Sequence, residues 1–243
     1  YAGVATGNLS VTNLTPKDGY QFRVIIQTTY CSSDTSNAVT LTVEGPMSWT
    51  AQPADVVQCS GESTTFSATA SIANSGSIGY IWQYSTDGIN WIAVPDNAVY
   101  DDVATNTLTV NDVAGLNNYL YRAVATSGVC TDFESDPAEL TVEGPLTVAD
   151  HPDDVTACSD LGVVFASDIT NSGEGIIFYQ WEESSDNGST WNDLFNQGRY
   201  NGVTTDTLSI DTVTALYDYQ YRVKAWTASC NVLTSNAATV LVE

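Results

Sequence analysis

Basic residues are scarce in this sequence. Six lysines and arginines stand against 29 aspartates and glutamates, which gives a formal net charge of −23. A negative field of this size repels phosphate backbones and anionic membranes, so it excludes nucleic acid as a partner. The sequence also lacks an apolar run near the roughly 20 residues of a membrane-spanning helix, so we expect no membrane insertion. The charge is compatible with an extracellular protein and with the binding of cations.

Groups that perform catalysis are scarce as well. There is one histidine, and the sequence contains no zinc-type cluster, no phosphate-binding loop and no nucleophile elbow. Pairs of carboxylates are uninformative, because a chain with 29 acidic residues produces them by chance. We therefore predict that the protein is not an enzyme, with no catalytic residue and no cofactor apart from one calcium candidate.

What the sequence does contain is an internal repeat with a period of about 99 residues. Matching segments begin at Tyr1, Tyr100 and Tyr200 and read YAGVATGNLSV, YDDVATNTLTV and YNGVTTDTLSI. The sequence Val-Glu-Gly-Pro occurs at 43–46 and again at 142–145, where it marks two seams.

The repeat predicts three domains. Residues 1–43 are the back half of a unit, and residues 44–143 and 144–243 are two complete units. Because the chain opens inside a unit, we interpret it as a piece of a longer protein, and whether Tyr1 is a true chain start stays open. The seams leave almost no linker between units, which favours a rod of stacked domains.

Short strands fill each complete unit. Thr, Val, Tyr and Ser are plentiful, and alternation of apolar with polar residues is typical of half-buried strands. In the last unit we predict strands at 146–148, 154–157, 163–169, 176–183, from 191, 207–210, 219–226 and 238–242. Seven or so short strands in about 100 residues predict an all-β, two-sheet sandwich.

A series of core-type residues recurs in both complete units. The residues are Trp82, Leu108, Val110 and Tyr121, then Trp181, Leu208, Ile210 and Tyr221. These residues follow one another in the order found in immunoglobulin-like domains, which the chain resembles. The resemblance covers both complete units and the half unit. It implies tandem immunoglobulin-like β-sandwiches with the two Trp and the two Tyr residues in their cores.

The sequence departs from this family at its two buried cysteines. They would fall near Ala68 and Ala123, or near Ala166 and Val223, and none of these positions is Cys. The actual cysteine positions and a Trp-containing hairpin are more similar to the immunoglobulin-type repeats of very large secreted surface proteins of Bacteroidota, which include gliding and adhesion filaments. This narrower resemblance implies a secreted or cell-surface location.

One hairpin occurs in both complete units, at 80–91 and 179–191. Its Asp/Asn-Gly turn suits antiparallel strands, because Gly and Asn tolerate positive φ. The longer copy also fits the Asp-box of sialidase-type propellers, through Ser184-x-Asp186-x-Gly188-x-Thr190-Trp191. We favour a structural turn, in which Asp186 accepts N–H groups of its own loop, over a glycosidase fragment, because the shorter copy keeps the hairpin without this spacing.

Other aromatic and basic residues have structural interpretations. Rings outside the core can stack on sugars, but we expect packing for Trp49, Trp91, Trp191 and Trp226. Three recurring arginines should face outward and form an ion pair or a cation–π contact with a neighbouring strand, with ligand binding as the less favoured alternative. These are Arg23, Arg122 and Arg222.

Five cysteines lie at positions locked to the repeat, which in an acidic, secreted chain implies disulfides. Cys158 lies in the turn between the predicted strands 154–157 and 163–169, and Cys59 lies at the equivalent position of the central unit. We call these two the turn cysteines. Cys31, Cys130 and Cys230 follow the strand that carries the core Tyr, and we call them the loop cysteines.

Two pairings stay open. One bridge per unit would join Cys59 to Cys130 and Cys158 to Cys230, leaving Cys31 alone. Immunoglobulin-like topology, however, puts the turn and the loop at opposite ends of a sandwich, roughly 25–30 Å apart, whereas bridged Cα atoms need about 4.4–6.8 Å. The alternative is a bridge between units, Cys59 to Cys230, with Cys130 and Cys158 bonded to neighbours outside this sequence.

Carboxylates gather at the start of the third unit. Hard cations take clustered carboxylate oxygens, so Asp150, Asp153 and Asp154 form a candidate calcium site, with a solvated acidic turn as the favoured alternative. Glycosylation patterns occur as well: Asn8, Asn13 and Asn187 match the N-linked acceptor. Thr207 and Thr212 resemble the O-linked acceptors of Bacteroidota surface proteins.

These features predict a structural or adhesive repeat segment of a long extracellular surface protein or filament, acting as a rigid spacer. Its partners would be neighbouring repeats, and other filament chains or surface glycans. One alternative is a carbohydrate- or protein-binding module of a secreted enzyme, which would need an exposed patch of Trp or Tyr faces. A second is a filament subunit that assembles by strand complementation of the half unit.

Overall fold

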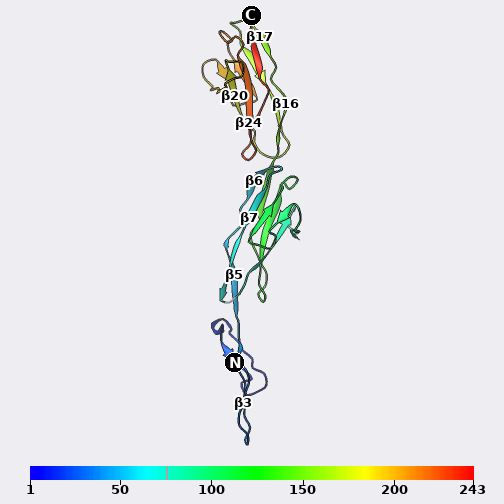
Figure 1. Cartoon of the computed structure of the whole chain (residues 1–243), viewed down its shortest axis with the longest axis vertical. Coiled ribbons are helices and arrows are strands. Elements are labelled where there is room, and N and C mark those ends of the chain that lie inside the picture. Colours follow the sequence, from blue (N-terminus) through cyan, green and yellow to red (C-terminus); the bar gives the residue numbers. More distant parts are fainter. Residues whose placement is uncertain (75) are drawn as a thin grey trace. The chain divides into compact units, whose positions relative to one another are not determined.

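The computed structural model describes residues 1–74 and 76–243. Strands joined by turns make up almost all of this part of the chain (Figure 1), together with one short 3-10 helix, η1 at Thr15–Lys17. In the described residues, no helix is long and apolar enough to cross a membrane.

Contacts divide the chain into two compact units. The first comprises Tyr1–Ala54, Thr65–Thr109 and Leu120–Ala138, and the second comprises Asp55–Thr64, Val110–Tyr119 and Glu139–Glu243. The sequence repeat 44–143 contributes segments to both units, and the repeat boundaries stay a prediction.

Residues 1–43 form two pairs of very short strands. The strands are β1 (Gln21–Phe22), β2 (Ile25–Ile26), β3 (Asp34–Thr35) and β4 (Val39–Thr40). β1 pairs antiparallel with β4, and β2 pairs antiparallel with β3. The Asp18 carboxylate accepts the Val43 N–H at 2.7 Å, which fixes the chain as it approaches the first seam.

The first compact unit also holds most strands of the central repeat. They are β5 (Glu44–Ala51), β7 (Thr64–Ser67), β8 (Thr69–Asn74), β9 (Gly79–Ser85), β10 (Ile92–Ala93), β11 (Tyr100–Asp101), β12 (Thr107–Val110), β13 (Tyr119–Thr126) and β14 (Phe133–Glu134). β9 pairs antiparallel with β10 and β13, and β13 pairs with β14. A second sheet runs in the order β11-β12-β7, while β5 pairs with β8.

The second compact unit contains the last repeat and two strands of the central one. The strands are β6 (Val56–Cys59), β15 (Ala138–Glu143), β16 (Leu146–Asp150), β17 (Val155–Ala157), β18 (Val163–Ala166), β19 (Asp168–Asn171), β20 (Phe178–Ser184), β21 (Asn192–Asp193), β22 (Tyr200–Asn201), β23 (Thr207–Ile210), β24 (Gln220–Trp226), β25 (Leu233–Thr234) and β26 (Ala238–Val242). β6 runs parallel to β15. In the last repeat one sheet has the order β17-β26-β24-β20-β21 with β25 beside β24, another has the order β18-β23-β22, and β16 pairs with β19.

The strands predicted for the last repeat are present, with one division. The run 163–169 is split into β18 and β19 at Ser167, whose N–H donates to Asp206 O and whose hydroxyl donates to Asp150 O. β18 pairs with β23 and β19 pairs with β16, so the chain changes its partner strand at this residue. β22 and β25 were not predicted, because two residues cannot show an alternating pattern.

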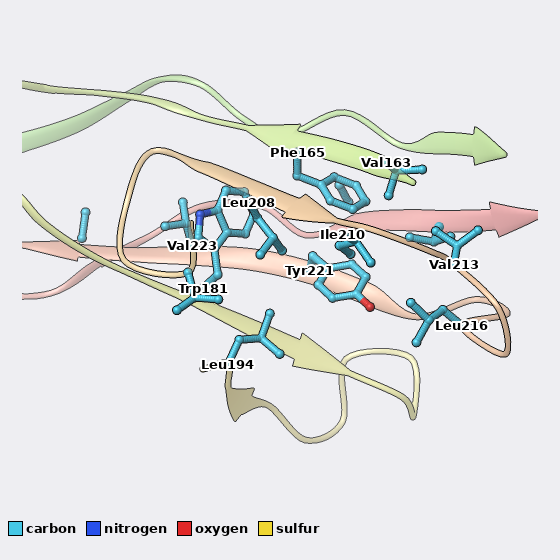
Figure 2. Packing of buried hydrophobic residues seen from close by; sticks show 14 of the residues in the cluster. Val163, Phe165, Trp181, Leu194, Leu208, Ile210, Val213, Leu216, Tyr221 and Val223 are labelled. Atoms are coloured by element: carbon cyan, nitrogen blue, oxygen red, sulfur yellow. The ribbon is translucent and has the colours of Figure 1, made fainter. Parts of the chain in front are cut away.

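The core of the last repeat lies between its sheets (Figure 2). The four residues predicted for the cores are fully buried: Trp82, Tyr121, Trp181 and Tyr221. Phe165 stacks on Tyr221 with ring centroids 5.1 Å apart. The indole N–H of Trp181 donates to Thr205 O at 2.9 Å, so the polar atom of this buried ring has a partner.

A single carboxylate holds the 179–191 hairpin together. Asp186 accepts hydrogen bonds from the Thr190 N–H at 2.8 Å, from the Thr190 hydroxyl at 2.7 Å and from the Ser184 hydroxyl at 2.8 Å. The Thr190 N–H and hydroxyl, followed by Ser184, stabilise the charged form and lower the pKa of Asp186 to about 2. Asp87 of the shorter copy accepts the N–H groups of Asn90 and Ile89, which lower its pKa as well. The Asp-box is a self-bonded turn, as the structural interpretation predicted.

Asp186→Asn should lower the melting temperature at about pH 5, because Asn lacks the charge that the donors stabilise. Folding lowers the pKa of Asp186, so its contribution is complete above the ordinary Asp pKa of about 3.9 and is lost as the pH falls through about 2. The difference in melting temperature between wild type and variant, measured by circular dichroism, should therefore disappear as the pH falls from about 4 to about 2. The exposed Asp160→Asn serves as the control, and a gap that stays constant with pH would contradict this role of Asp186.

Candidate functional site

One disulfide joins the central and last repeats, where Cys59 is bonded to Cys230. Their Cα atoms are 4.9 Å apart, although the residues are separated by 171 positions in the sequence. The predicted bridge between two sequence repeats is the one that forms. The alternative of one bridge within each repeat, Cys59–Cys130 and Cys158–Cys230, is wrong. Cys31, Cys130 and Cys158 are free.

The register of β6 against β15 explains this pairing. The two strands run parallel and place Cys59 opposite Glu143, the last residue of the central repeat. The loop cysteine of the same repeat, Cys130, contacts the other seam, since its thiol donates to Gly45 O at 3.5 Å. One sandwich keeps its two cysteines at different seams, and this is the physical reason why they do not bond to each other.

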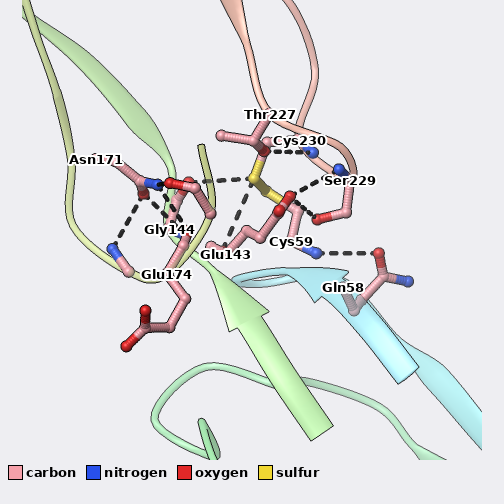
Figure 3. Close-up of a disulfide and its surroundings, with 11 residues drawn as sticks. Gln58, Cys59, Glu143, Gly144, Asn171, Glu174, Thr227, Ser229 and Cys230 are labelled. Atoms are coloured by element: carbon pink, nitrogen blue, oxygen red, sulfur yellow. Dashed lines mark hydrogen bonds between the residues drawn. A yellow bond between two sulfur atoms is a disulfide. The ribbon is translucent and has the colours of Figure 1, made fainter. Parts of the chain in front are cut away.

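Glu143 is a buried carboxylate beside the disulfide (Figure 3), with 4% of its surface exposed. Its Oε2 accepts the Ser229 N–H at 2.7 Å and the Ser229 hydroxyl at 2.6 Å. Burial alone would raise the pKa of Glu143, but donors from Ser229, Thr227 and the Ala228 N–H outweigh it and hold the pKa below its ordinary value. The charged carboxylate therefore anchors the loop of Cys230 at the seam.

The glycine of Val-Glu-Gly-Pro is required by a close approach of two backbones. A Cβ on Gly144 would lie 2.1 Å from the N atom of Gly173, so no side chain fits between them. Asn171 Oδ1 accepts the N–H groups of both Gly144 and Gly173 at 3.1 Å. The seam is thus held by the disulfide, by Glu143 and by this amide, all within the second compact unit.

Sequence reasoning missed a hydroxyl that fixes each loop cysteine. A Ser or Thr three residues earlier accepts the cysteine N–H: Thr28 for Cys31 at 2.9 Å, Ser127 for Cys130 at 2.9 Å and Thr227 for Cys230 at 3.1 Å. The signal was present in the sequence as Ser/Thr-x-x-Cys in all three loops. At the first seam Ser127 Oγ also donates to Glu44 Oε2 at 2.6 Å, so Glu44 and Glu143 hold equivalent loops.

Two of the three arginines, Arg122 and Arg222, form both of the contacts expected for them. Arg122 and Arg222 lie over the rings of Trp91 and Trp191, with the guanidinium carbon 4.3 and 4.0 Å from the ring centroid. Arg222 Nε also pairs with Glu182 Oε2 at 2.7 Å, and Arg122 forms an ion pair as well. These side chains hold the hairpins from outside the core. Their charged groups are therefore engaged in contacts within the protein.

A shallow cavity of about 270 Å³ lies on the last repeat, lined by Gln180, Asp193, Lys224, Trp226 and Val232. Its polar groups are already bonded within the protein. Lys224 Nζ lies 2.7 Å from Asp193 Oδ1, and Gln180 Nε2 donates to backbone oxygens. Trp49, Trp91, Trp191 and Trp226 are all half-buried, in line with packing.

The acidic segment 150–154 contributes to strand pairing. The carboxylate of Asp154 accepts the Thr239 N–H at 2.6 Å, as that of Asp55 accepts the Glu139 N–H at 2.8 Å in the central repeat. Asp150 and Asp153 are exposed, and nowhere in the described chain do three or more potential metal ligands come together. A calcium ion here stays a prediction.

The candidate glycosylation residues differ in exposure. Asn8, Asn13 and Asn187 are exposed, whereas Thr207 and Thr212 are half-buried. The Thr207 hydroxyl donates to Asp206 and the Thr212 hydroxyl donates to Ser159 O. Glycosylation of all five stays a prediction.

Residues 1–43 surround an open cavity of about 550 Å³, lined among others by Leu9, Phe22, Arg23 and Val39. Leu9 is 45% exposed, whereas Leu108 and Leu208 at the equivalent positions are fully buried. In residues 1–43, Leu9 thus lines an open face, whereas its counterparts lie in the cores of their sandwiches.

One protein family matches this chain twice. Its model, described as "Domain of unknown function (DUF8696)", matches residues 50–144 and 153–243, which together exceed half of the chain. None of the curated proteins matches the sequence.

Solved structures of tandem domains are similar to the chain. They include extracellular domains 3–5 of Drosophila OTK (16% identity, 92% of this chain and 70% of that one covered, TM-score 0.55), a multi-domain fragment of titin (19%, 94% and 77%, 0.58) and the three N-terminal domains of the Hoc protein of bacteriophage RB49 (13%, 92% and 78%, 0.59). At these identities the likeness shows the fold alone. It confirms the all-β class of tandem immunoglobulin-like sandwiches.

Glu143→Ala should loosen the Cys230 loop. The half-buried Ser229 N–H and hydroxyl would lose their shared acceptor, and leaving donors unpaired costs about 1–3 kcal/mol when water cannot replace it. Hydrogen exchange of the Ser229 amide, read by NMR, should become about tenfold faster or more. Glu174→Ala, at an exposed residue of the same junction, is the matched control and should leave this rate unchanged. An unaltered Ser229 rate in the Glu143 variant would rule out the anchoring role.

Proposed function

This chain belongs to the family described as "Domain of unknown function (DUF8696)", and from that premise we propose that it is a structural repeat segment of a long extracellular surface protein or filament. Its tandem sandwiches act as a stiff spacer, which holds apart whatever lies at either side. The proposal does not require a ligand, because the task is mechanical.

The observation that carries the proposal is the junction at Cys59, Glu143 and Cys230. Short seams between domains normally leave relative motion free unless the interface is large. Here a covalent bond and a buried, hydrogen-bonded carboxylate act at the same seam. A spacer needs such a restraint, whereas a binding module on a flexible tether does not.

The aromatic residues support a spacer over a carbohydrate-binding module. None of the six tryptophans is exposed in the part of the chain that the structure describes, which disfavours a sugar-binding face built on them. Exposed rings there include those of Tyr1, Tyr20, Tyr30 and Tyr217. The net charge of −23 supports the spacer as well, because like-charged segments repel one another and stay apart. Disulfide formation fits an oxidising, extracellular setting.

A second candidate, assembly by strand complementation, is favoured by the open cavity in residues 1–43. Strands of another copy would cover the face that contains Leu9 and Phe22. Sedimentation of the reduced chain tests this candidate, since oligomers that persist without disulfides support it and a monomer at every concentration excludes it.

Stiffness of the seam can be measured by electron-spin distances. Spin labels on non-natural amino acids at the exposed positions Ala114 and Phe195, both within the second compact unit, report on the central and last repeats without using thiols. The oxidised chain should give a narrow distance distribution, and Cys59→Ser with Cys230→Ser should broaden it about twofold or more. Cys130→Ser is the thiol control and should change nothing. A distribution that is equally broad with the disulfide intact would refute the spacer.

A further inference from the structure

Two covalent paths connect Cys59 to Cys230. One is the peptide chain, along which the two cysteines are separated by 171 positions. The other is the disulfide, which joins them directly and lies beside the seam at Glu143 (Figure 3). Once non-covalent contacts give way, tension along the chain follows the shorter covalent path. The disulfide is that path, so residues 60–229 form a loop that a pull on the chain cannot straighten.

Most of both sandwiches lies inside this loop. It contains every strand from β7 to β24 and, with them, the fully buried core rings of Trp82, Tyr121, Trp181 and Tyr221. Outside it lie β5 and β6 on one side and β25 and β26 on the other. A bridge within each repeat would have left the seam at 142–145 on the load-bearing path, whereas the bridge between repeats encloses the seam as well.

The bridge also changes the load on the β6–β15 pair. β6 runs parallel to β15, with Cys59 opposite Glu143. Without the bridge, a pull on the chain acts on β6 from its N-terminal end and on β15 from its C-terminal end, so the two strands slide past each other. With the bridge, Cys59 is bonded to Cys230, and the N–H of Ser229 in the same loop donates to Glu143 at 2.7 Å. Both strand ends are then fastened to one loop, and sliding would require a covalent bond to break.

From this connectivity we propose that the Cys59–Cys230 bridge is a strap that limits extension of the chain. It carries the tension at the seam and keeps residues 60–229 folded under a load that unfolds the chain without the bridge. The inference rests on the proposed function, because a spacer that holds other parts apart has to resist being stretched. Each fully extended residue spans at most about 3.3–3.6 Å, so the strap withholds roughly 600 Å of extension.

The surroundings of the strap protect it from exchange with other thiols. Thiol–disulfide exchange requires a thiolate to reach one of the two sulfurs. Cys230 is only 9% exposed, and Cys59 is half-buried. The Thr227 hydroxyl and the Glu143 carboxylate both fix the Cys230 loop over the seam. These contacts favour a bridge that persists where small thiols are present.

Pulling single molecules by their two ends tests the strap. Peptide tags at the termini, coupled without thiols, attach the chain to two surfaces. The oxidised chain should reach a fully extended length that is roughly 600 Å shorter than that of Cys59→Ser with Cys230→Ser. Cys130→Ser is the thiol control and should match the wild type. Equal lengths of the wild type and the double variant would overturn the proposal.

Reduction at constant force tests whether the enclosed residues stay folded. A dithiol reductant attacks the bridge with one thiolate and then closes on itself with the second, which leaves two cysteine thiols and a cyclic disulfide. The force is held at a value where the reduced chain unfolds within seconds. The oxidised wild type should gain the withheld length only after reduction, in separate steps as each sandwich unfolds. One single step of roughly 600 Å would mean that these residues were already unfolded behind the bridge, which contradicts the strap.

The outcome is independent of the spin-label measurement of stiffness. A narrow distance distribution combined with a single full-length step would refute this inference alone and leave the spacer standing. A broad distribution combined with separate steps would refute the spacer instead.

Discussion

The buried carboxylate of Glu143 is the interaction on which the junction depends. A charge removed from water is unfavourable unless hydrogen bonds replace the lost solvent. Here the Ser229 N–H and hydroxyl supply them, and the pKa of Glu143 falls below its ordinary value in spite of burial. The charged carboxylate thereby holds the Cys230 loop of the last repeat against Glu143, the final residue of the central repeat. The parallel pairing of β6 with β15 brings Cys59 to the same place, where it is bonded to Cys230.

Each sandwich is stabilised by its own core, and the disulfide acts at a different level. Trp82 and Trp181 are fully buried within their own repeats and need no neighbour to exclude water. The bridge instead closes a loop across a sequence separation of 171, which in the chain-entropy model stabilises the folded state by about 5 kcal/mol. The cores stabilise the sandwiches, while the disulfide links the turn of Cys59 to the loop of Cys230.

Much of the fold could be predicted from the sequence, because strand alternation and the repeat report on the same core. The strands of the last repeat, the buried Trp181 and the self-bonded turn of Asp186 were all found in this way. The disulfide pairing stayed open, because the repeat favoured one bridge per unit whereas the immunoglobulin-like topology favoured a bridge between units. The structure decides it, with β6 placing Cys59 opposite Glu143. The burial of Glu143 could not be foreseen, since a Glu between domains is ordinarily solvated. The Thr227 hydroxyl was visible as a spacing, yet its partner is a backbone N–H that no pattern identifies.

The pairing of Cys59 is the central claim, and peptide mapping of the monomeric oxidised chain under non-reducing conditions tests it most directly. Free thiols are first blocked at low pH to prevent exchange, and the protein is then digested without reductant. The account predicts one bridged peptide pair, Cys59 with Cys230, and alkylated Cys31, Cys130 and Cys158. A bridge from Cys59 to Cys130, or from Cys158 to Cys230, would contradict it.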